Sequence, residues 1–139
     1  MGQAKDAAQK FYDLFGAGRI ADTAALFDPS CITLFPTGPL NAAEHIQVAQ
    51  AFKSGFPDST MTVEHAVESG DEAVIVGRYT GTQTGDLHSP DGTIPATGRP
   101  IDLQFMDYVK VGRDGKIVDH TVVFDQMAML GQLGVLPSA

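Results

Sequence analysis

Apolar and polar residues alternate on both sides of a turn near residues 112–115. In the runs 101–111 and 116–125, branched and aromatic side chains occupy every second position, a pattern typical of two β-strands joined as a hairpin. Two ionisable residues interrupt the apolar faces of these runs, Asp107 in the first and His120 in the second. A carboxylate on a buried face is costly unless it has a partner or lies in a polar cavity. The hairpin is therefore the first place to look for a functional site.

The length of the turn decides whether the two side chains share a face. A four-residue loop at 112–115 places Asp107 opposite His120, and a two-residue loop at 114–115 places Asp107 opposite Val122, with His120 one diagonal away. Both registers keep the pair on one face, whereas a five-residue loop would separate it, because a shift by one residue turns every side chain over. The pair is then either a structural bridge in the core or a titratable pair in a pocket, suited to moving protons near neutral pH.

Apolar residues at helical spacing predict helices in four places, at residues 3–15, 19–27, 41–56 and 125–134. Asn41 opens a capping box at the start of the third helix, and Asp125 is placed to cap the fourth. His45 lies beside the apolar stripe of the third helix, and we interpret it as a partly buried helix histidine rather than a catalyst.

Further strands are predicted at 31–35, 60–68 and 72–83, the last two forming a second hairpin. Strict alternation puts His65 on the same apolar face as its neighbours in the 60–68 strand, and it puts Tyr79 on an apolar face of the 72–83 strand.

Helices in the first part of the chain and hairpins in the second predict an α+β fold, and the 139 residues form a single domain, 1–139. A curved sheet wrapped on helices leaves a concave face, and the unusual polar residues sit where that face would be. The Gly- and Pro-rich connection at 84–100 is long enough to be functional, and we expect its 85–98 part to close over the pocket mouth.

The net charge of −8 argues against binding to nucleic acid or to an anionic membrane, because both need a basic surface. No run approaches the ~20 apolar residues of a membrane span, and residues 1–10 have no secretory apolar segment. The single cysteine, Cys31, fits a reducing cytoplasm. No H-x-x-x-H or C-x-x-C motif is present, so we expect no metal site.

Six short motifs follow one another in the order of a known family: F-P-D at 56–58, E-S-G-D at 68–71, G-T-Q-T-G-D-L at 81–87, P-A-T-G-R-P-I at 95–101, D-G-K-I-V-D-H at 114–120 and D-Q-M-A-M-L-G-Q-L-G at 125–134. Together they resemble the SnoaL-like polyketide cyclases, within the nuclear-transport-factor-2-like superfamily. The resemblance implies a cone-shaped NTF2-like fold, in which a curved antiparallel sheet wraps on three N-terminal helices and a short C-terminal helix follows. It also implies a cofactor-free aldol ring closure of a polyketide ester, with a pocket residue as general acid and base.

Two positions depart from the pattern of that family. The last strand commonly reads E-H-W-D, and its aspartate, the acid/base candidate of the family, falls on Val122 here. Gln83 stands where the family frequently has histidine. Because these two positions lack the ionisable side chains of the family, we expect Asp107, His120 and His65 to carry out any catalysis.

We therefore expect Asp107 to act as the base with His120 as its partner, and His65 or Tyr79 to donate to the developing enolate oxygen. The remaining pocket residues are expected to bind the substrate: Phe35, Phe52, Tyr79, Phe105, Val122 and Phe124.

The first hypothesis is a cofactor-independent cyclase, isomerase or related lyase acting on a small apolar, oxygenated, polyketide-like molecule. The alternatives are a small-molecule-binding protein without turnover, or a hydrolase or dehydratase on the same fold. Members of the family commonly pair through the outer face of the sheet, where Gln104, Met106 and Tyr108 mix polar and apolar groups, so we expect a homodimer.

Overall fold

The computed structural model describes residues 2–90 and 92–136. Its helical elements are α1 (Gln3–Gly16), η1 (Ile20–Leu26), α2 (Ala42–Gly55) and α3 (Gln126–Leu133). Its strands are β1 (Thr33–Phe35), β2 (Gly38–Leu40), β3 (Thr60–Ser69), β4 (Glu72–Thr82), β5 (Leu87–Ser89), β6 (Gly92–Ile94), β7 (Pro100–Val111) and β8 (Ile117–Phe124).

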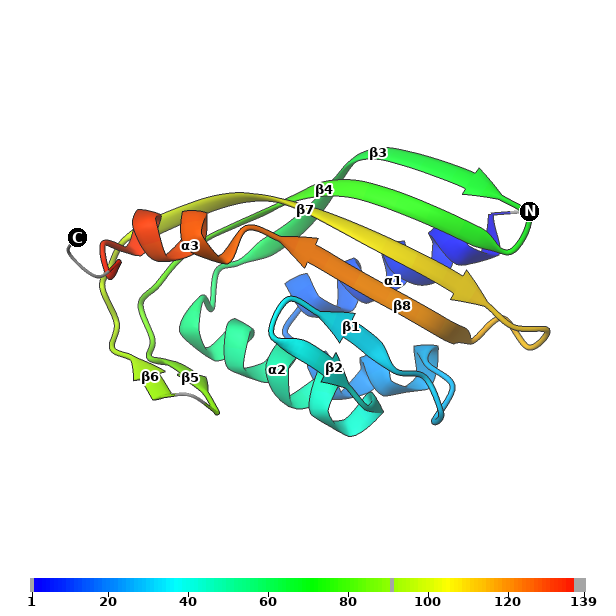
Figure 1. Ribbon diagram of the computed structural model, residues 1–139, viewed down its shortest axis with the longest axis horizontal. Coiled ribbons are helices and arrows are strands. Elements are labelled where there is room, and N and C mark those ends of the chain that lie inside the picture. Colours follow the sequence, from blue (N-terminus) through cyan, green and yellow to red (C-terminus); the bar gives the residue numbers. More distant parts are fainter. Residues whose placement is uncertain (1, 91, 137–139) are drawn as a thin grey trace.

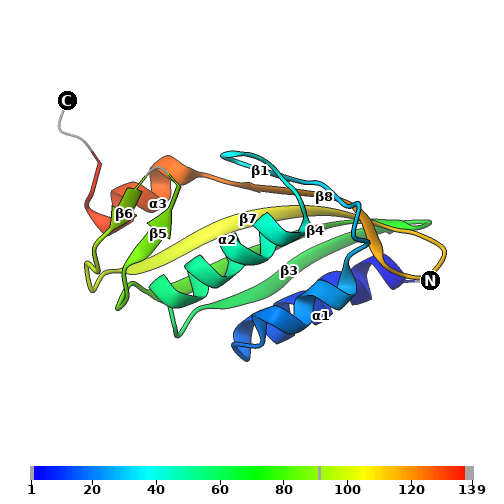
Figure 2. The ribbon, with the colours of Figure 1, turned by 90° about the horizontal axis from the view of Figure 1, so that it is seen from below.

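Six of these strands form one curved sheet in the order β2-β1-β8-β7-β4-β3. Neighbouring strands are antiparallel, except that β1 runs parallel to β8. The long helices α1 and α2 lie lengthwise on one face of this sheet, and α3 lies beyond the end of β8 (Figures 1 and 2). The predicted α+β fold, with a curved sheet wrapped on N-terminal helices, is confirmed.

The first helix forms because its apolar residues recur at helical spacing and pack on the sheet. Its buried side chains are Ala4, Ala7, Ala8, Phe11, Tyr12 and Phe15. The predicted second helix is present, and it is a 3₁₀ helix. The hydroxyl of Thr23 donates to the carbonyl of Ile20 at 2.7 Å, and such side-chain bonds to the backbone compete with α-helical bonding.

Both predicted N-caps are confirmed. Asn41 and Glu44 form the reciprocal capping box of α2, and the carboxylate of Asp125 accepts from the backbone N–H of Ala128 at the start of α3. Gly134 ends α3 in the left-handed conformation, with φ of 73°. The two ends of the C-terminal helix are therefore fixed by Asp125 and Gly134, as predicted from the sequence.

A β-bulge resolves the register of the last hairpin. Asp107 pairs with Val122 and Val109 with His120, as predicted for the two-residue loop. The observed connection is nevertheless five residues long, 112–116. Without a bulge, a connection of this length would place Asp107 and His120 on opposite faces of the sheet. The register shifts between Lys110 and Val111, so Val118 is an extra residue that points outward and restores the shared face. Strict alternation would place Val118 on the inner face with His120 and Val122, and the bulge is the reason that it is exposed.

The long connection after β4 contains two short strands. Its β5 and β6 strands pair into a small hairpin beyond the C-terminal end of α2 (Figure 1). The fully buried amide of Gln83 anchors it, donating to the carbonyl of Ile94 at 2.9 Å and accepting from the N–H and hydroxyl of Thr97. Gln83 therefore acts as a structural anchor of the 84–100 segment.

No helix in the described parts of the chain is both long and apolar enough to cross a membrane.

Candidate active site

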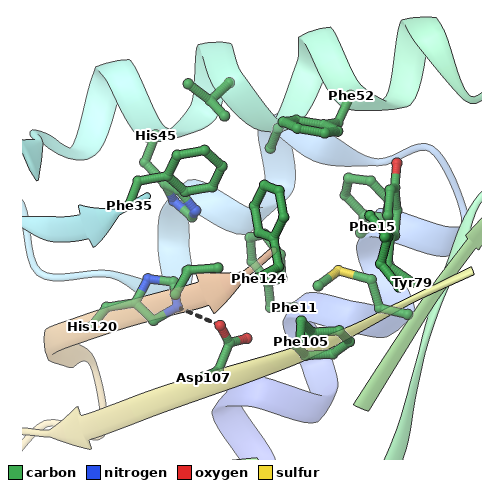
Figure 3. A pocket seen from close by; sticks show the side chains of 15 residues that line it. Phe11, Phe15, Phe35, His45, Phe52, Tyr79, Phe105, Asp107, His120 and Phe124 are labelled. Atoms are coloured by element: carbon green, nitrogen blue, oxygen red, sulfur yellow. Dashed lines mark ion pairs between the residues drawn. The ribbon is translucent and has the colours of Figure 1, made fainter. Parts of the chain in front are cut away.

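A largely apolar cavity lies between the concave face of the sheet and the helices α1 and α2 (Figure 3). The space that the centres of water molecules can reach inside it is about 80 Å³, which is room for several waters or a small ligand. The six side chains predicted to bind substrate all line this cavity: Phe35, Phe52, Tyr79, Phe105, Val122 and Phe124.

Asp107 is the buried carboxylate of this cavity, with 3% of its surface exposed. One oxygen, Oδ2, accepts a hydrogen bond of 2.5 Å from the hydroxyl of Tyr12. The other, Oδ1, lies 3.6 Å from Nε2 of His120 and has no hydrogen-bond partner within residues 2–90 and 92–136. A buried acceptor without a partner is rare and costly, which makes Oδ1 the candidate reactive atom of the site.

His120 faces Asp107 from the neighbouring strand (Figure 3). Its Nδ1 lies 3.0 Å from the hydroxyl of Thr33, which is itself buried. The parallel pairing of β1 with β8 sets Thr33 directly beside His120. The imidazole is therefore fixed on one side by a hydroxyl and turned on the other toward the carboxylate.

Tyr12 was not identified from the sequence. Burial, the charge of Asp107 and the hydrogen bond to it together raise the pKa of Tyr12 far above its ordinary range. The phenol therefore keeps its proton and remains a donor to the carboxylate. Tyr12 belongs to the buried stripe of α1, but spacing alone does not reveal a partner 95 positions away on β7.

His45 is the second residue that the sequence analysis did not assign to the site. It is 6% exposed and lines the cavity from α2, with its ring centroid 5.3 Å from that of His120. Burial, and secondarily His120, lower the pKa of His45 to about 4, although Asp107 acts in the opposite direction. One signal was available, because His45, Ala49 and Phe52 follow each other at helical spacing and all face the cavity.

His65 does not reach the cavity, and its predicted place on the inner face was wrong. The pairing of β3 with β4 shifts between Val63 and His65, so that Glu64 is an extra residue in a second β-bulge. Beyond this bulge the alternation is reversed: Ala66 turns toward the core and His65 is exposed. His65 therefore cannot touch a molecule bound in the cavity.

Tyr79 lines the cavity, but its hydroxyl already has a partner. It donates a hydrogen bond of 3.1 Å to the hydroxyl of Ser59, which is completely buried. Burial raises the pKa of Tyr79, so the phenol stays protonated. The predicted donor role toward an enolate is thus less suited to Tyr79 than to a side chain without a partner.

Three phenylalanines form an aromatic cluster around the less buried part of the cavity. Phe35, Phe52 and Phe124 come from β1, α2 and β8, and their ring centroids lie 5.5 to 6.2 Å apart in edge-to-face arrangements. All three are half-buried, whereas Asp107, His120 and His45 are buried. The polar groups therefore lie deeper in the cavity than this aromatic cluster.

No metal centre is indicated by the arrangement of side chains. Across residues 2–90 and 92–136, no group of three or more histidine, cysteine or acidic side chains is placed to hold a metal ion.

Comparison with known proteins connects this architecture to one family. The model of the SnoaL-like polyketide cyclase family matches residues 5–133. A comparison with curated proteins gave no match.

Several solved structures share the fold. The crystal structure of IdmH from Streptomyces antibioticus, a candidate polyketide cyclase, is 29% identical, with a TM-score of 0.79 over 96% of this chain and 99% of that one. A candidate SnoaL-like polyketide cyclase from Jannaschia Sp. CCS1 is 21% identical, with a TM-score of 0.81 over 97% of this chain and 94% of that one. AclR from Streptomyces galilaeus, a candidate hydroxylase, is 18% identical, with a TM-score of 0.84 over 99% of both chains. Since the family model covers nearly the whole sequence, the chain belongs to the SnoaL-like polyketide cyclase family.

Proposed function

We propose that the protein is a cofactor-independent enzyme that removes a proton next to a carbonyl group of a small apolar, oxygenated, polyketide-like molecule, and so promotes ring closure or isomerisation. One observation carries the proposal. Among the residues that the structure describes, the buried carboxylate of Asp107 has one oxygen held by Tyr12, and its other oxygen has no hydrogen-bond partner and lies beside an apolar cavity. Such an oxygen is placed to act as a general base.

The position of Asp107 offsets the absence of the family aspartate. The resemblance assigns that aspartate to position 122, which is valine here, and Val122 pairs directly with Asp107 across β7 and β8. Side chains of directly opposed residues start about 5 Å apart. A carboxylate at 107 therefore serves the same region of the cavity as one at 122.

The proposed step needs only groups of this chain. A C–H bond beside the carbonyl breaks, its proton passes to Oδ1 of Asp107, and its electron pair forms the enolate. In a ring closure the enolate carbon then attacks a second carbonyl carbon, whose C=O π bond breaks, and the new alkoxide takes the proton back from Asp107. In an isomerisation Asp107 returns the proton to another carbon of the conjugated enolate. His120, 3.6 Å from Oδ1 and held by Thr33, faces the carboxylate and keeps it oriented.

The experiment follows deuterium exchange by NMR in D₂O. The probes are polyketide-like methyl esters and α-tetralone, a bicyclic ketone with an exchangeable CH₂ group beside its carbonyl. We expect the protein to accelerate exchange and Asp107→Asn to slow it by roughly 100-fold or more, the usual weight of a general base. Asp119→Asn is the matched control, because Asp119 is an exposed carboxylate on β8. Equal rates for Asp107→Asn and the unaltered protein would refute the proposed role of Asp107.

The second candidate function is ligand binding without turnover, and valine at position 122 favours it. In that case the ketone should bind in the cavity, with exchange no faster than in buffer.

A further inference from the structure

Most polar side chains that face the cavity already have hydrogen-bond partners. The hydroxyl of Tyr79 donates to Ser59. His120 has the hydroxyl of Thr33 at Nδ1 and the carboxylate of Asp107 on its Nε2 side. Neither side chain is therefore available to a ligand without breaking a contact that holds it.

His45 is the exception. No hydrogen bond joins either of its ring nitrogens to another group within residues 2–90 and 92–136, and they point into the space between α2 and the Asp107–His120 pair (Figure 3). The ring stacks on Phe11, with centroids 5.5 Å apart and planes at 23°, and meets Phe27 edge-on at 5.2 Å. The aromatic contacts therefore fix the imidazole in one orientation while leaving its polar edge to the cavity.

The groups that face His45 keep its ring neutral. Burial and His120 of β8 lower the pKa of His45 to about 4, and the opposing effect of Asp107 of β7 is smaller. A neutral imidazole carries one N–H donor and one acceptor nitrogen. Because this ring does not take up a second proton near neutral pH, its N–H can stabilise an oxyanion without placing a positive charge beside His120.

We infer that His45 is a further catalytic residue of this site, which donates its ring N–H to the carbonyl oxygen of the substrate while Asp107 removes the adjacent proton. The inference rests on the proposed function. In the step, the C–H bond breaks and the proton goes to Oδ1 of Asp107. The C–H electron pair becomes the new C=C bond, and the π pair of the carbonyl moves onto its oxygen. That oxygen accepts the hydrogen bond from His45, which keeps its own proton, and the return of the proton to carbon reverses the sequence. The substrate carbonyl thus lies on the α2 side of the cavity and its acidic C–H on the β7 side.

The kinetic test uses α-tetralone exchange with His45 variants. His45→Phe keeps the stacking on Phe11 but removes the donor, so we expect kcat to fall by about 100-fold or more, with KM nearly unchanged. His45→Gln retains an N–H donor and should recover a measurable part of the lost rate. His88→Phe, at an exposed histidine on β5, is the matched control. An unchanged kcat for His45→Phe, in a protein whose exchange still depends on Asp107, would overturn the inference and leave the proposed function standing.

A binding test separates the inference from turnover. The probes are 1-naphthol, which offers an oxygen at the position of the enolate, and naphthalene, which has none. The unaltered protein should bind 1-naphthol more tightly, and His45→Phe should lose about three- to tenfold of affinity for 1-naphthol while keeping its affinity for naphthalene. His45→Met repeats the test should the larger ring disturb folding, which circular dichroism reports. The same affinity ratio for the two probes in the unaltered protein and in a folded variant would overturn the inference, whether or not any ketone is turned over.

Discussion

The hydroxyl of Tyr12 donates a hydrogen bond to Oδ2 of Asp107 and so joins α1 to β7 across 95 positions of the chain. This contact gives one oxygen of the buried carboxylate a hydrogen-bond donor, whereas the other oxygen, Oδ1, has no donor among the described residues and lies at the cavity. A helix residue thus orients the proposed base, and the same bond fastens the helix to the sheet.

Tyr12→Phe should therefore destabilise the fold more than Tyr79→Phe does. The first change leaves a buried charged acceptor without its donor, at a cost of about 2–3 kcal/mol, whereas the second removes a neutral bond to Ser59 worth about 1 kcal/mol. Urea unfolding of the two variants measures the difference. Equal losses would mean that the carboxylate finds another donor when Tyr12 is truncated.

His65→Ala should leave ketone exchange within about twofold of the unaltered rate, because general acid–base effects need direct contact and His65 is exposed on β3. His120→Asn should slow the same reaction clearly, because His120 faces the proposed base. The paired rate measurements check the corrected placement of His65. A large loss in His65→Ala alone would contradict it.

The two β-bulges explain why alternation predicted one site histidine correctly and another wrongly. Alternation assumes that each residue of a strand has one partner. The extra residue Val118 keeps His120 on the inner face despite a five-residue connection, and the extra residue Glu64 turns His65 outward. Nothing in the local sequence separates these cases, because the bulges are set by how the strands fit the curvature of the sheet.

Other features were accessible from the sequence because they depend on near neighbours. The capping box at Asn41 and the cap at Asp125 involve residues three positions apart. The Tyr12–Asp107 bond and the parallel pairing that brings Thr33 to His120 link distant segments, and only the assembled fold creates them. The aromatic lining was predictable, since Phe105 and Phe124 lie on the apolar faces of long strands and pair with each other.

Gln83→Ala should loosen the segment between β4 and β7. The variant loses the bonds to Ile94 and Thr97 that hold this segment, while the backbone N–H of Gly85 still donates to the carbonyl of Gly55 at 3.2 Å. We expect thermolysin to cut the variant within residues 84–100 several times faster than the unaltered protein. Thr93→Ala, which loses only an exposed bond to His88, is the control.

The same digestion tests the predicted lid role of residues 85–98. Slower cutting of the unaltered protein in the presence of 1-naphthol would support this role, and equal cutting would argue against it.

The outer face of the sheet should pair two copies of the chain. Its exposed apolar residues include Met106 and Val123, which are direct partners on β7 and β8, together with Leu34 and Val74. Exposed apolar clusters of this kind suit a protein interface better than open solvent. We propose a homodimer through this face, and we expect Met106→Lys combined with Val123→Lys to give a monomer in sedimentation at micromolar concentration. Met127→Lys on α3 is the control, and a monomeric unaltered protein would refute the proposal.

The pH dependence of stability should reveal the buried His45. Its pKa is about 4 in the folded chain, against an ordinary value of 6.5. Between these values the unfolded chain binds a proton that the folded chain does not, so the free energy of unfolding rises with pH across this window. The contribution is fully present above about pH 6.5 and is lost as the pH falls toward 4, with a total of roughly 3 kcal/mol. His45→Phe lacks this group, so urea unfolding of the two proteins at a series of pH values should give a stability difference that changes only within the window. A difference that stays constant from pH 4 to pH 7 would show that the imidazole is protonated as readily in the folded chain as in the unfolded one, and it would remove the neutral donor on which the role of His45 depends.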